Sequence, residues 1–401
     1  MPVRDRTWSE YLRRTDEQSN VRRILAWAER STNQNESDVR NEIRLLSLFL
    51  TTTNRPLRDR ATRALVERAA QRPDVLFDEV LRSLSFGDPY VPERMLAAAY
   101  GVSMRFWADP HGEKLRGAIV PFARSLVKEM FVANAPHATK HVLQRGYAVG
   151  VIALARKINP RAIATRQVSL LSPPFAQIRS PFVDPAAIDE AAVKDSRQAM
   201  HMDFANYTIG RLVPGRGNYQ DAHPGYQAVR LQIARRMFDL GYSAEFSELD
   251  RSIAQMQPVS RQSDGGKTDR YGKKYSWIAF FEMYGVRSDL DLLGDRRSRE
   301  RSSDCDIDPS FPVEPQEWVP PLPDLFTAAP TDYGGWLAHG PVPDYTDLFV
   351  RSDVDGLAGG PWVLINGFIQ QAGSHERETF TFIRGLFMRQ RDIAVTSHNV
   401  V

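Results

Sequence analysis

Hydrophobic residues recur at spacings of three and four positions through the first part of the chain, between residues 39 and 158. Such spacing places apolar side chains along one face of a helix. It predicts consecutive helices at residues 39–50, 57–70, 75–84, 92–107, 115–132 and 139–155. Pro56, Pro89 and Pro136 stand in the connections. Each marks the end of one helix and the start of the next, because proline is tolerated in a first turn but not in a helix interior.

The predicted helices come in pairs, and the second helix of each pair is rich in alanine and glycine. Examples are Ala61 and Ala64, then Ala98 and Gly101, then Gly150. Small side chains let neighbouring helices approach closely. The pattern favours a solenoid of paired helices of the HEAT or armadillo type. Because the pairs begin at uneven intervals, an irregular α-helical domain fits the sequence equally well.

The pattern changes after residue 158. Prolines crowd residues 159–185, which is typical of a junction between domains. Helical spacing returns at residues 187–202, 226–240 and 271–284. We therefore expect a second helical lobe after the first.

The C-terminal part of the chain combines several patterns. Residues 309–343 mix prolines with large aromatic residues, which predicts an extended arm packed on the helical body. Residues 362–365 predict a strand, followed by a turn at Asn366-Gly367. Residues 378–391 fit either a strand or a helix.

Together these patterns predict a mostly α protein, with a paired-helix (HEAT-like) N-terminal body and a mixed α+β C-terminal region. Residues 1–158 form the predicted helical body. Residues 159–300 form a second helical lobe that contains the segment 269–285. Residues 301–401 comprise the proline-rich arm and a small α/β terminal segment.

Composition narrows the class of protein. The chain has 401 residues, of which 42% are hydrophobic and 25% charged, so it can bury a large core. Its longest apolar stretch, near residues 147–155, is far shorter than the roughly 20 residues of a membrane-spanning helix. The first residues also lack the apolar centre of a secretory signal peptide. We expect a cytoplasmic protein with no membrane partner.

Charge and cysteine content exclude further classes. Cys305 is the single cysteine, so the chain has no intramolecular disulfide framework. The formal net charge of +3 is too small to indicate a nucleic-acid binder by itself. The densest basic run, residues 296–301, is interpreted as a solvated loop, with a patch that contacts phosphate as the alternative.

Two polar segments resemble ligand loops, but each lacks an essential part. Residues 265–268, Gly-Gly-Lys-Thr, resemble the tail of a phosphate-binding loop, whose first glycine would stand where this chain has Arg261. Residues 304–308 carry alternating aspartates, as in a calcium loop, but Pro309 replaces the glycine that should follow. The preferred interpretations are a flexible loop for residues 265–268 and a turn for residues 304–308.

Zinc and nucleophile signatures are incomplete as well. His137 and His141 are four residues apart, but the glutamate of a metalloprotease helix and a third ligand are missing, so surface or interface histidines are preferred. No serine lies in a Gly-x-Ser-x-Gly elbow, and Cys305 lies between aspartates that discourage a thiolate. We predict no catalytic residue, no cofactor and no metal site.

The strongest candidate site is the start of the helix within residues 269–285. Arg270, Lys273 and Lys274 are placed there, ahead of an almost wholly apolar run. Cations at a helix N-terminus oppose the helix dipole and cost roughly 0.3–1 kcal/mol each. Two readings follow. Carboxylates such as Glu282, Asp289 or Asp291 neutralise the lysines, or the lysines bind an anion.

Interfaces between proteins are rich in arginine and aromatic residues. Arg58, Tyr90, Arg94 and Arg105 are therefore predicted as exposed binding residues on the helical body. They suit a protein partner.

Four groups of segments, spread in order over most of the chain, carry a resemblance to a known family. They are residues 54–65, residues 88–94 with 99–101, residues 202–213, and residues 269–279 with 306–310. In these segments the chain resembles the C-terminal region of large bacterial STAND-type ATPases with NACHT-like modules, a group that includes antiviral defence proteins.

The resemblance implies the sensor end of such a protein, which follows an effector and an ATPase in that family. This chain lacks the Walker motifs, so ATP binding is carried over to no residue. The implied partner is an ATPase or effector chain, or a phage protein.

Two hypotheses follow from the sequence. The preferred one is a non-catalytic scaffold that senses a ligand or binds a protein within an antiviral STAND-type system. The alternative is an enzyme, or a subunit of one, that acts on a phosphorylated or nucleic-acid ligand held near Lys273 and Lys274. A purely structural scaffold needs the same packed helices, and the sequence does not separate it from a sensor.

Overall fold

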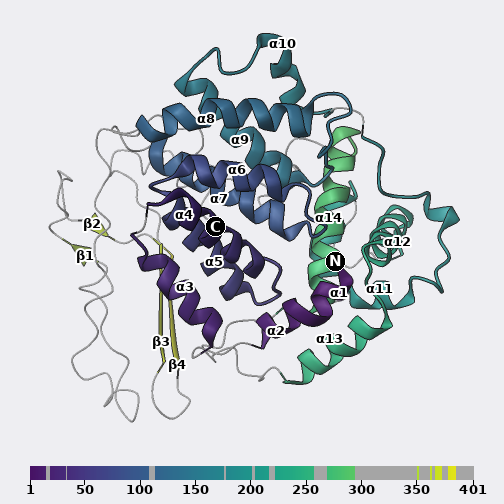
Figure 1. Cartoon of the computed structure of the whole chain (residues 1–401). Helices are drawn as coiled ribbons and strands as arrows, with labels where there is room; N and C mark the ends of the chain where they lie inside the picture. Colours follow the sequence, from purple (N-terminus) through teal and green to yellow (C-terminus); the bar gives the residue numbers. More distant parts are fainter. Residues whose placement is uncertain are drawn as a thin grey trace. The chain divides into compact units, whose positions relative to one another are not determined.

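A computed structural model describes residues 1–14, 19–32, 34–107, 113–175, 178–200, 204–215, 222–256, 269–293, 350–351, 362–363, 366–372 and 378–384. The chain divides into two compact units, Met1–Val313 and Glu314–Val401. The described part of the first unit is dominated by helices (Figure 1). This confirms the prediction of a mostly α protein.

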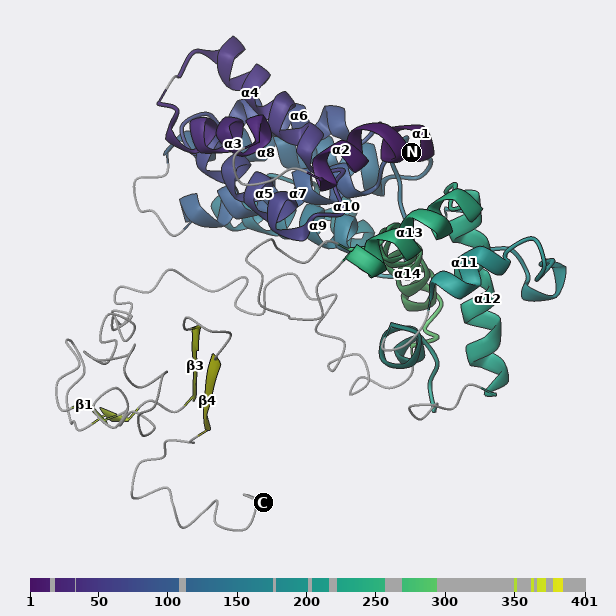
Figure 2. The same ribbon diagram turned by 90° about the horizontal axis from the view of Figure 1, so that it is seen from below.

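The first half of the first unit is a stack of helices in two rows. The helices are α3 (Asn20–Arg30), α4 (Glu36–Phe49), α5 (Arg55–Ala69), α6 (Pro73–Ser83), α7 (Tyr90–Trp107), α8 (Glu113–Leu126) and α9 (Val142–Ile158). Helices α4, α6 and α8 pack in sequence along one row, and α3, α5, α7 and α9 along the other. Figure 2 shows α4 and α6 above α5, α7 and α9. Consecutive helices also pack across the rows, most extensively α4 on α5, α6 on α7 and α8 on α9.

Local chemistry sets where these helices begin. Asn54 caps α5, because its side-chain oxygen accepts a hydrogen bond from the backbone N–H of Leu57 at 3.2 Å. Asn35 caps α4 in the same way. Pro73 lies in the first turn of α6, where its missing N–H costs nothing. The predicted helix at 115–132 ends earlier than expected, and Val127–Phe131 form a π-helical turn after α8.

Small residues bring the helices of one row close together. Ala61, Ala64, Ala98 and Ala148 are all fully buried. A Cβ atom at Gly150 on α9 would lie 2.8 Å from a ring carbon of Tyr100 on α7, so only glycine fits that contact. The small side chains thus act as the sequence analysis expects.

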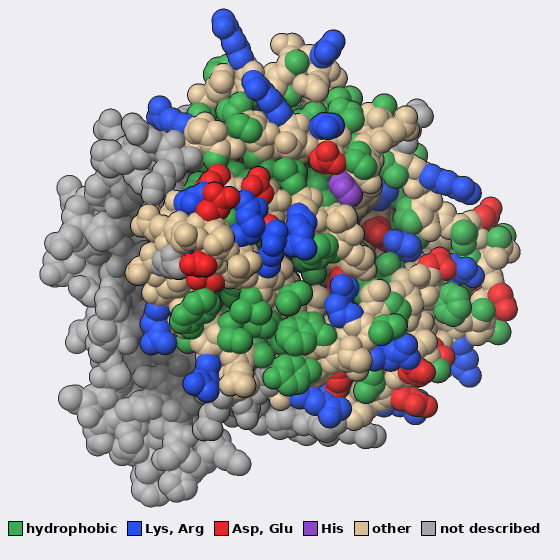
Figure 3. Space-filling model, in the orientation of Figure 1, with side chains coloured by type: hydrophobic (Ala, Val, Ile, Leu, Met, Phe, Trp, Pro, Cys, Tyr) green, Lys and Arg blue, Asp and Glu red, His purple; other side chains and the backbone are tan. Residues whose placement is uncertain are grey.

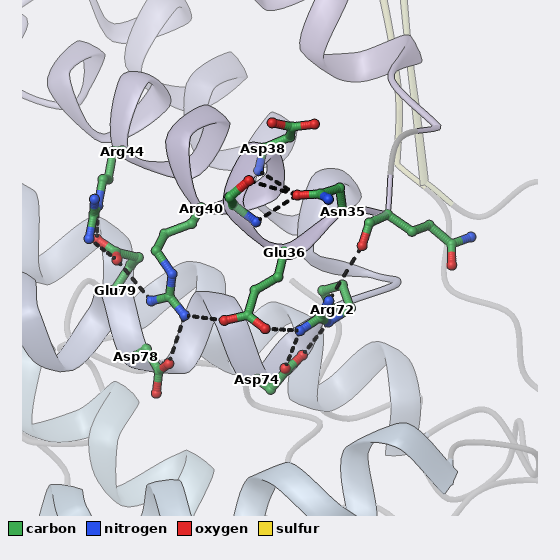
Figure 4. A network of polar contacts seen from close by, with 11 residues as sticks. Asn35, Glu36, Asp38, Arg40, Arg44, Arg72, Asp74, Asp78 and Glu79 are labelled. Atoms are coloured by element: carbon green, nitrogen blue, oxygen red, sulfur yellow. Dashed lines mark hydrogen bonds and ion pairs between the residues drawn. The ribbon is translucent and has the colours of Figure 1, made fainter.

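In the row formed by α4, α6 and α8, charged side chains join α4 to α6, as Figure 4 shows. Arg40 on α4 bonds to Glu36, Asp78 and Glu79, each at 3.0–3.1 Å. Burial would raise the pKa of Glu79, but hydrogen bonds from Arg44, Arg40 and Arg82 outweigh it and lower that pKa. These residues, with Arg72 and Asp74, are called the α4–α6 network below.

The N-terminal residues and the second half of the first unit complete its helices. Before α3 come α1 (Pro2–Arg4), a π-helical turn (Asp5–Ser9) and α2 (Glu10–Arg13). After α9 come α10 (Thr165–Val168), α11 (Lys194–Ala199), α12 (Pro224–Asp239), α13 (Ala244–Met256) and α14 (Tyr271–Asp289), with short 3₁₀ or π turns at Ser169–Leu171, Pro185–Ala187, Phe204–Thr208 and Ile209–Leu212.

The described residues of the first unit form two hydrophobic clusters. One spans the stack from Leu12 to Ile163, and the other gathers residues from Ile188 to Leu293. Helix α14 packs against α12 and α13 and also against α9 (Figure 1). It therefore joins the second cluster to the stack. The domain boundaries at residues 158 and 300 stay a prediction.

The predicted helix at 187–202 is wrong for most of its length, since within its described residues, 187–200, only Lys194–Ala199 are α-helical. The side chains of Asp184 and Asp189 accept hydrogen bonds from the backbone N–H groups of Ala186 and Ala191. Such local bonds stabilise turns at the expense of a helix.

The described part of the second unit consists of two antiparallel strand pairs. Strand β1 (Val350–Arg351) pairs with β2 (Trp362–Val363), and β3 (Asn366–Ala372) pairs with β4 (Glu378–Arg384). Asn366 and Gly367, predicted as a turn, instead begin β3. The described residues of this unit include no helix, so they do not support the predicted mixed α+β arrangement.

Several predicted features lie outside the described residues. They are the arm at 309–343, the loops at 265–268 and 304–308, the basic run at 296–301, and Cys305. Within the described part of the chain, no helix is long and apolar enough to cross a membrane.

Candidate functional site

The start of α14 is neutralised by a carboxylate from α13. Asp250 accepts hydrogen bonds from the backbone N–H groups of Tyr271 at 2.5 Å and Gly272 at 2.7 Å, and from the hydroxyl of Tyr242 at 2.8 Å. Burial raises the pKa of Asp250, although these hydrogen bonds oppose the rise. The side chain occupies the position at a helix N-terminus where a bound anion would otherwise lie.

Lys274 turns its side chain into the protein interior. Its ammonium Nζ donates to Asp5 Oδ1 at 2.8 Å, to Asp88 Oδ2 at 2.8 Å and to the backbone oxygen of Thr51 at 2.9 Å. An ammonium group has three donors, and all three are used. Lys274, Asp5 and Asp88 are fully buried. We call these three residues the Lys274 cluster.

Further contacts complete the cluster. Asp5 also accepts hydrogen bonds from Ser9 at 2.8 Å and from the Tyr275 hydroxyl at 3.1 Å. Arg4 forms an ion pair with Asp88 at 3.1 Å. With Arg4 included, two cations face two carboxylates. The cluster thus joins α14 to three segments that are remote in sequence, and its charges balance internally.

Lys273 points elsewhere and is partly exposed. Its ammonium lies 2.9 Å from Asp269, one turn earlier. Asp269 is itself fixed by a backbone hydrogen bond from its N–H to the carbonyl of Thr53 at 2.9 Å. The two neighbouring lysines therefore have different carboxylate partners in different surroundings.

The prediction that carboxylates neutralise the lysines is right in kind, but the named partners are wrong. Glu282 pairs with Arg236, and Asp289 pairs with Lys140 and Arg145. A helix rises 1.5 Å per residue, so Glu282 is about 12 Å along α14 from Lys274. Asp291 lies still further away.

Arg270, the third predicted residue of this helix start, lines a pocket of about 560 Å³ beside α11 and α13. Asp250 and Tyr242 also line it. Neither predicted lysine contributes to its lining. The structure therefore separates Arg270 from Lys274.

Arg58 and Tyr90 were expected on the surface, and both are buried. Arg58 donates to the backbone oxygen of Thr52 at 3.0 Å, and its guanidinium lies 4.7 Å from the centre of the Tyr90 ring. The Lys274 ammonium lies 5.2 Å from the same ring. Both residues thus belong to the surroundings of the Lys274 cluster. Their burial depends on packing by remote segments, and no local pattern signals it.

Arg94 and Arg105 are on one face of α7 and reach α5. Arg94 pairs with Asp59 at 3.2 Å, and Arg105 pairs with Glu67 at 2.6 Å. Asp59 and Glu67 line a shallow depression of about 770 Å³, together with Glu29, Arg60 and Arg63. We call this surface of α3 and α5, with the two α7 arginines beside it, the charged groove.

His137 and His141 do not form a zinc pair. His137 faces Glu129 at 3.8 Å, and the buried His141 has its Nε2 atom 3.5 Å from Glu93. Burial, aided by the charge of Arg145, lowers the pKa of His141 to about 3. In the regions that the structure describes, no three His, Cys, Asp or Glu residues are placed to hold a metal ion.

Sequence reasoning missed the two carboxylates that hold Lys274. Asp88 stands directly before Pro89 in the connection between two predicted helices, and nothing there points to Lys274. Asp5 has no signal either, because it is one of many charged residues in the first helical turns.

Comparisons with protein-family models, curated proteins and solved structures find no match to this chain. The resemblance to STAND-type ATPases therefore rests on the sequence segments alone.

Proposed function

We propose that this chain is a non-catalytic, protein-binding scaffold with a HEAT-like stack, and that it acts with an ATPase chain of a bacterial antiviral STAND-type system. The observation that carries the proposal is the charged groove, where α3, α5 and α7 present alternating charges on one face of the stack. Stacked helix pairs commonly use such extended surfaces for binding.

The chemistry of the groove suits recognition of a protein. The side chains of Arg105 and Glu67 are about half exposed, at 51% and 43%. Exposed ion pairs contribute only about 0–1 kcal/mol to stability. These side chains can therefore exchange their internal partners for those of a bound protein at little cost, and arginine is among the residues that dominate interface energies.

The alternative, an enzyme that holds a phosphorylated or nucleic-acid ligand near Lys273 and Lys274, has less support. All three donors of Lys274 bond inside the protein, and Asp250 occupies the helix N-terminus. A phosphate would have to displace buried carboxylates. Lys273 pairs with Asp269, and Arg270 lines a pocket to which neither lysine contributes.

The test is affinity capture from the bacterial host during phage challenge. The wild-type chain is compared with the double variant Arg94→Glu and Arg105→Glu, and with Arg166→Glu, an exposed control on α10. Circular dichroism verifies folding. We expect an ATPase chain or a phage protein to be captured by the wild type and the control, and lost from the groove variant.

Capture that is identical for all three proteins would count against the groove. Recovery of bound nucleotide or nucleic acid in place of a protein would favour the enzymatic alternative.

A further inference from the structure

A second surface, formed by α2, α3 and α4, exposes large apolar side chains. Tyr11 is 52% exposed, Trp27 50% and Leu48 45%. Figure 3 shows hydrophobic side chains gathered over α2 and α3. Exposed apolar patches on a protein surface mark interaction sites. We call Tyr11, Trp27 and Leu48 the aromatic patch.

Part of the patch is held rigidly by the core. Trp8 stacks on Tyr11, with ring centres 5.7 Å apart, and on the buried Phe49 at 6.3 Å. The Trp8 indole N–H donates to the backbone oxygen of Leu48 at 2.9 Å. A surface that is fixed before binding loses little conformational freedom when a partner binds.

Two guanidinium groups flank Trp27 on the same face of α3. Arg23 precedes Trp27 by four residues and Arg30 follows it by three, so all three share one side of the helix. Arg23 contacts the side chain of Asn20 at 3.5 Å, and Arg30 donates to the backbone oxygen of Ala26 at 2.9 Å. Among the residues that the structure describes, neither guanidinium forms an ion pair with a carboxylate.

The acidic residue nearest to them in sequence is directed elsewhere. Glu29 follows Trp27 by two residues, which turns it about 200° around the helix. Its carboxylate accepts hydrogen bonds from Nε and Nη2 of Arg60, at 2.8 Å each, and it lines the charged groove. The two sides of α3 therefore differ: one carries a neutralised ion pair, and the other an aromatic ring between positive charges.

We infer that the aromatic patch binds an acidic, amphipathic segment of a partner protein. Apolar side chains of that segment cover Tyr11, Trp27 and Leu48, and its carboxylates pair with Arg23 and Arg30. This inference rests on the protein-binding role proposed above, but it concerns a surface other than the charged groove. Tryptophan, tyrosine and arginine are the residue types most enriched among those that dominate binding energies.

The probe is a fluorescein-labelled amphipathic peptide with a leucine face flanked by glutamates. Its binding to the full chain is followed by fluorescence anisotropy, beside a counterpart in which lysines replace the glutamates. We expect the acidic peptide to bind and the basic one not to bind. Added salt weakens binding, because the guanidinium groups lie at the solvent-exposed surface.

Variants locate the site. Trp27→Ala, and separately the double variant Arg23→Glu with Arg30→Glu, should each weaken binding of the acidic peptide roughly tenfold or more. The double variant keeps Trp27 in place, so it tests the charges even if Trp27→Ala disturbs α3. Arg166→Glu should bind as the wild type does, and so should the groove variant Arg94→Glu with Arg105→Glu.

Several results would overturn the inference. They are no binding of the acidic peptide to the wild type, equal binding by all variants, or preference for the basic peptide. Binding of a labelled single-stranded oligonucleotide or of anionic phospholipid vesicles that depends on Arg23 and Arg30, in place of peptide binding, would assign the patch to another class of partner. The two proposals are tested separately. Loss of captured protein in the groove variant supports the proposed function, and the peptide titration alone supports or overturns the inference about the aromatic patch.

Discussion

The Lys274 cluster and the α4–α6 network use the same chemistry in opposite surroundings. In the cluster, Lys274, Asp5 and Asp88 have no exposed surface. In the network, Glu79 is buried, but the side chains of Arg40, Glu36 and Asp78 around it are 23%, 57% and 63% exposed. The cluster joins segments far apart in the sequence, whereas the network joins neighbouring helices of one row (Figure 4).

The difference shows that exposure to water, more than the number of ion pairs, determines how much stability is lost when one charged residue is removed. Exposed pairs contribute about 0–1 kcal/mol each, because water and salt compete for the charges. A buried pair adds little net stability when complete, but removing one member costs about 3–5 kcal/mol. Loss of one charged residue from the cluster should therefore disrupt the packing of α14 on the N-terminal residues. Loss of one from the network should leave the packing of α4 on α6 largely intact.

The largest effect is expected from Lys274→Met. This change leaves the carboxylates of Asp5 and Asp88 buried with one cation fewer, so the free energy of unfolding should fall by about 3–5 kcal/mol. Urea denaturation measures it. The matched control is Lys273→Met, whose partly exposed pair with Asp269 should cost less than about 1 kcal/mol. Similar losses for both variants would contradict the comparison.

A smaller loss is expected from Asp250→Ala. Without this carboxylate, the N–H groups of Tyr271 and Gly272 and the Tyr242 hydroxyl lose their acceptor, which should cost about 2 kcal/mol. Thermal unfolding by circular dichroism measures the change. Asp239→Ala, which removes an exposed ion pair with Arg235, serves as the control and should cost a few tenths of a kcal/mol. An unchanged melting temperature for Asp250→Ala would show that α14 needs no such cap.

Stability should also fall in acid because of His141. Its pKa of about 3 in the folded protein is below the ordinary value of 6.5, so only the unfolded chain takes up this proton between those values. The contribution of the neutral His141 to the free energy of unfolding is therefore complete above pH 6.5 and is lost as the pH falls toward 3. At pH 5 the loss should be about 2 kcal/mol.

Urea denaturation across this pH range tests the prediction. His141→Phe retains a ring against Phe281, 5.4 Å away in the wild type, and should flatten the decline in stability. His137→Phe should leave the decline unchanged. A slope that is the same in all three proteins would remove His141 from the explanation.

The smallest effect is expected from Arg40→Ala in the α4–α6 network. The buried Glu79 keeps Arg44 and Arg82 as partners, so the free energy of unfolding should fall by no more than about 1 kcal/mol. The difference from the wild type should shrink further in high salt. A salt-independent loss as large as that of Lys274→Met would mean that the network acts as a buried cluster.

Much of the helical body could be predicted, because its signals are local. The spacing of apolar residues placed helices α4 to α9 of the stack but not α3, and Asn54 with Pro56 marked the start of α5. The expectation of a negative partner for the start of α14 was also sound, because the helix dipole requires it wherever the helix lies. The predicted helix at 187–202 failed where aspartate turns competed with a weak helical pattern.

Other features depended on tertiary structure. Asp5 meets Lys274 across 269 positions of sequence, and no periodicity within either segment records that contact. Arg58 and Tyr90 have the composition of an exposed interface, yet remote segments cover them. Likewise, Arg94 and Arg105 reach Asp59 and Glu67 only because α7 packs on α5.

The sequence by itself determined where helices α4 to α9 of the stack lie, which of their faces are apolar, and that the start of α14 needs compensation by negative charge. Hydrogen bonds within four residues and side-chain spacing along one helix suffice for these features. Only the tertiary structure decided which carboxylates provide the compensation and which arginines remain at the surface. Those outcomes depend on burial, and burial is set by segments, remote in sequence, that come together as the chain folds.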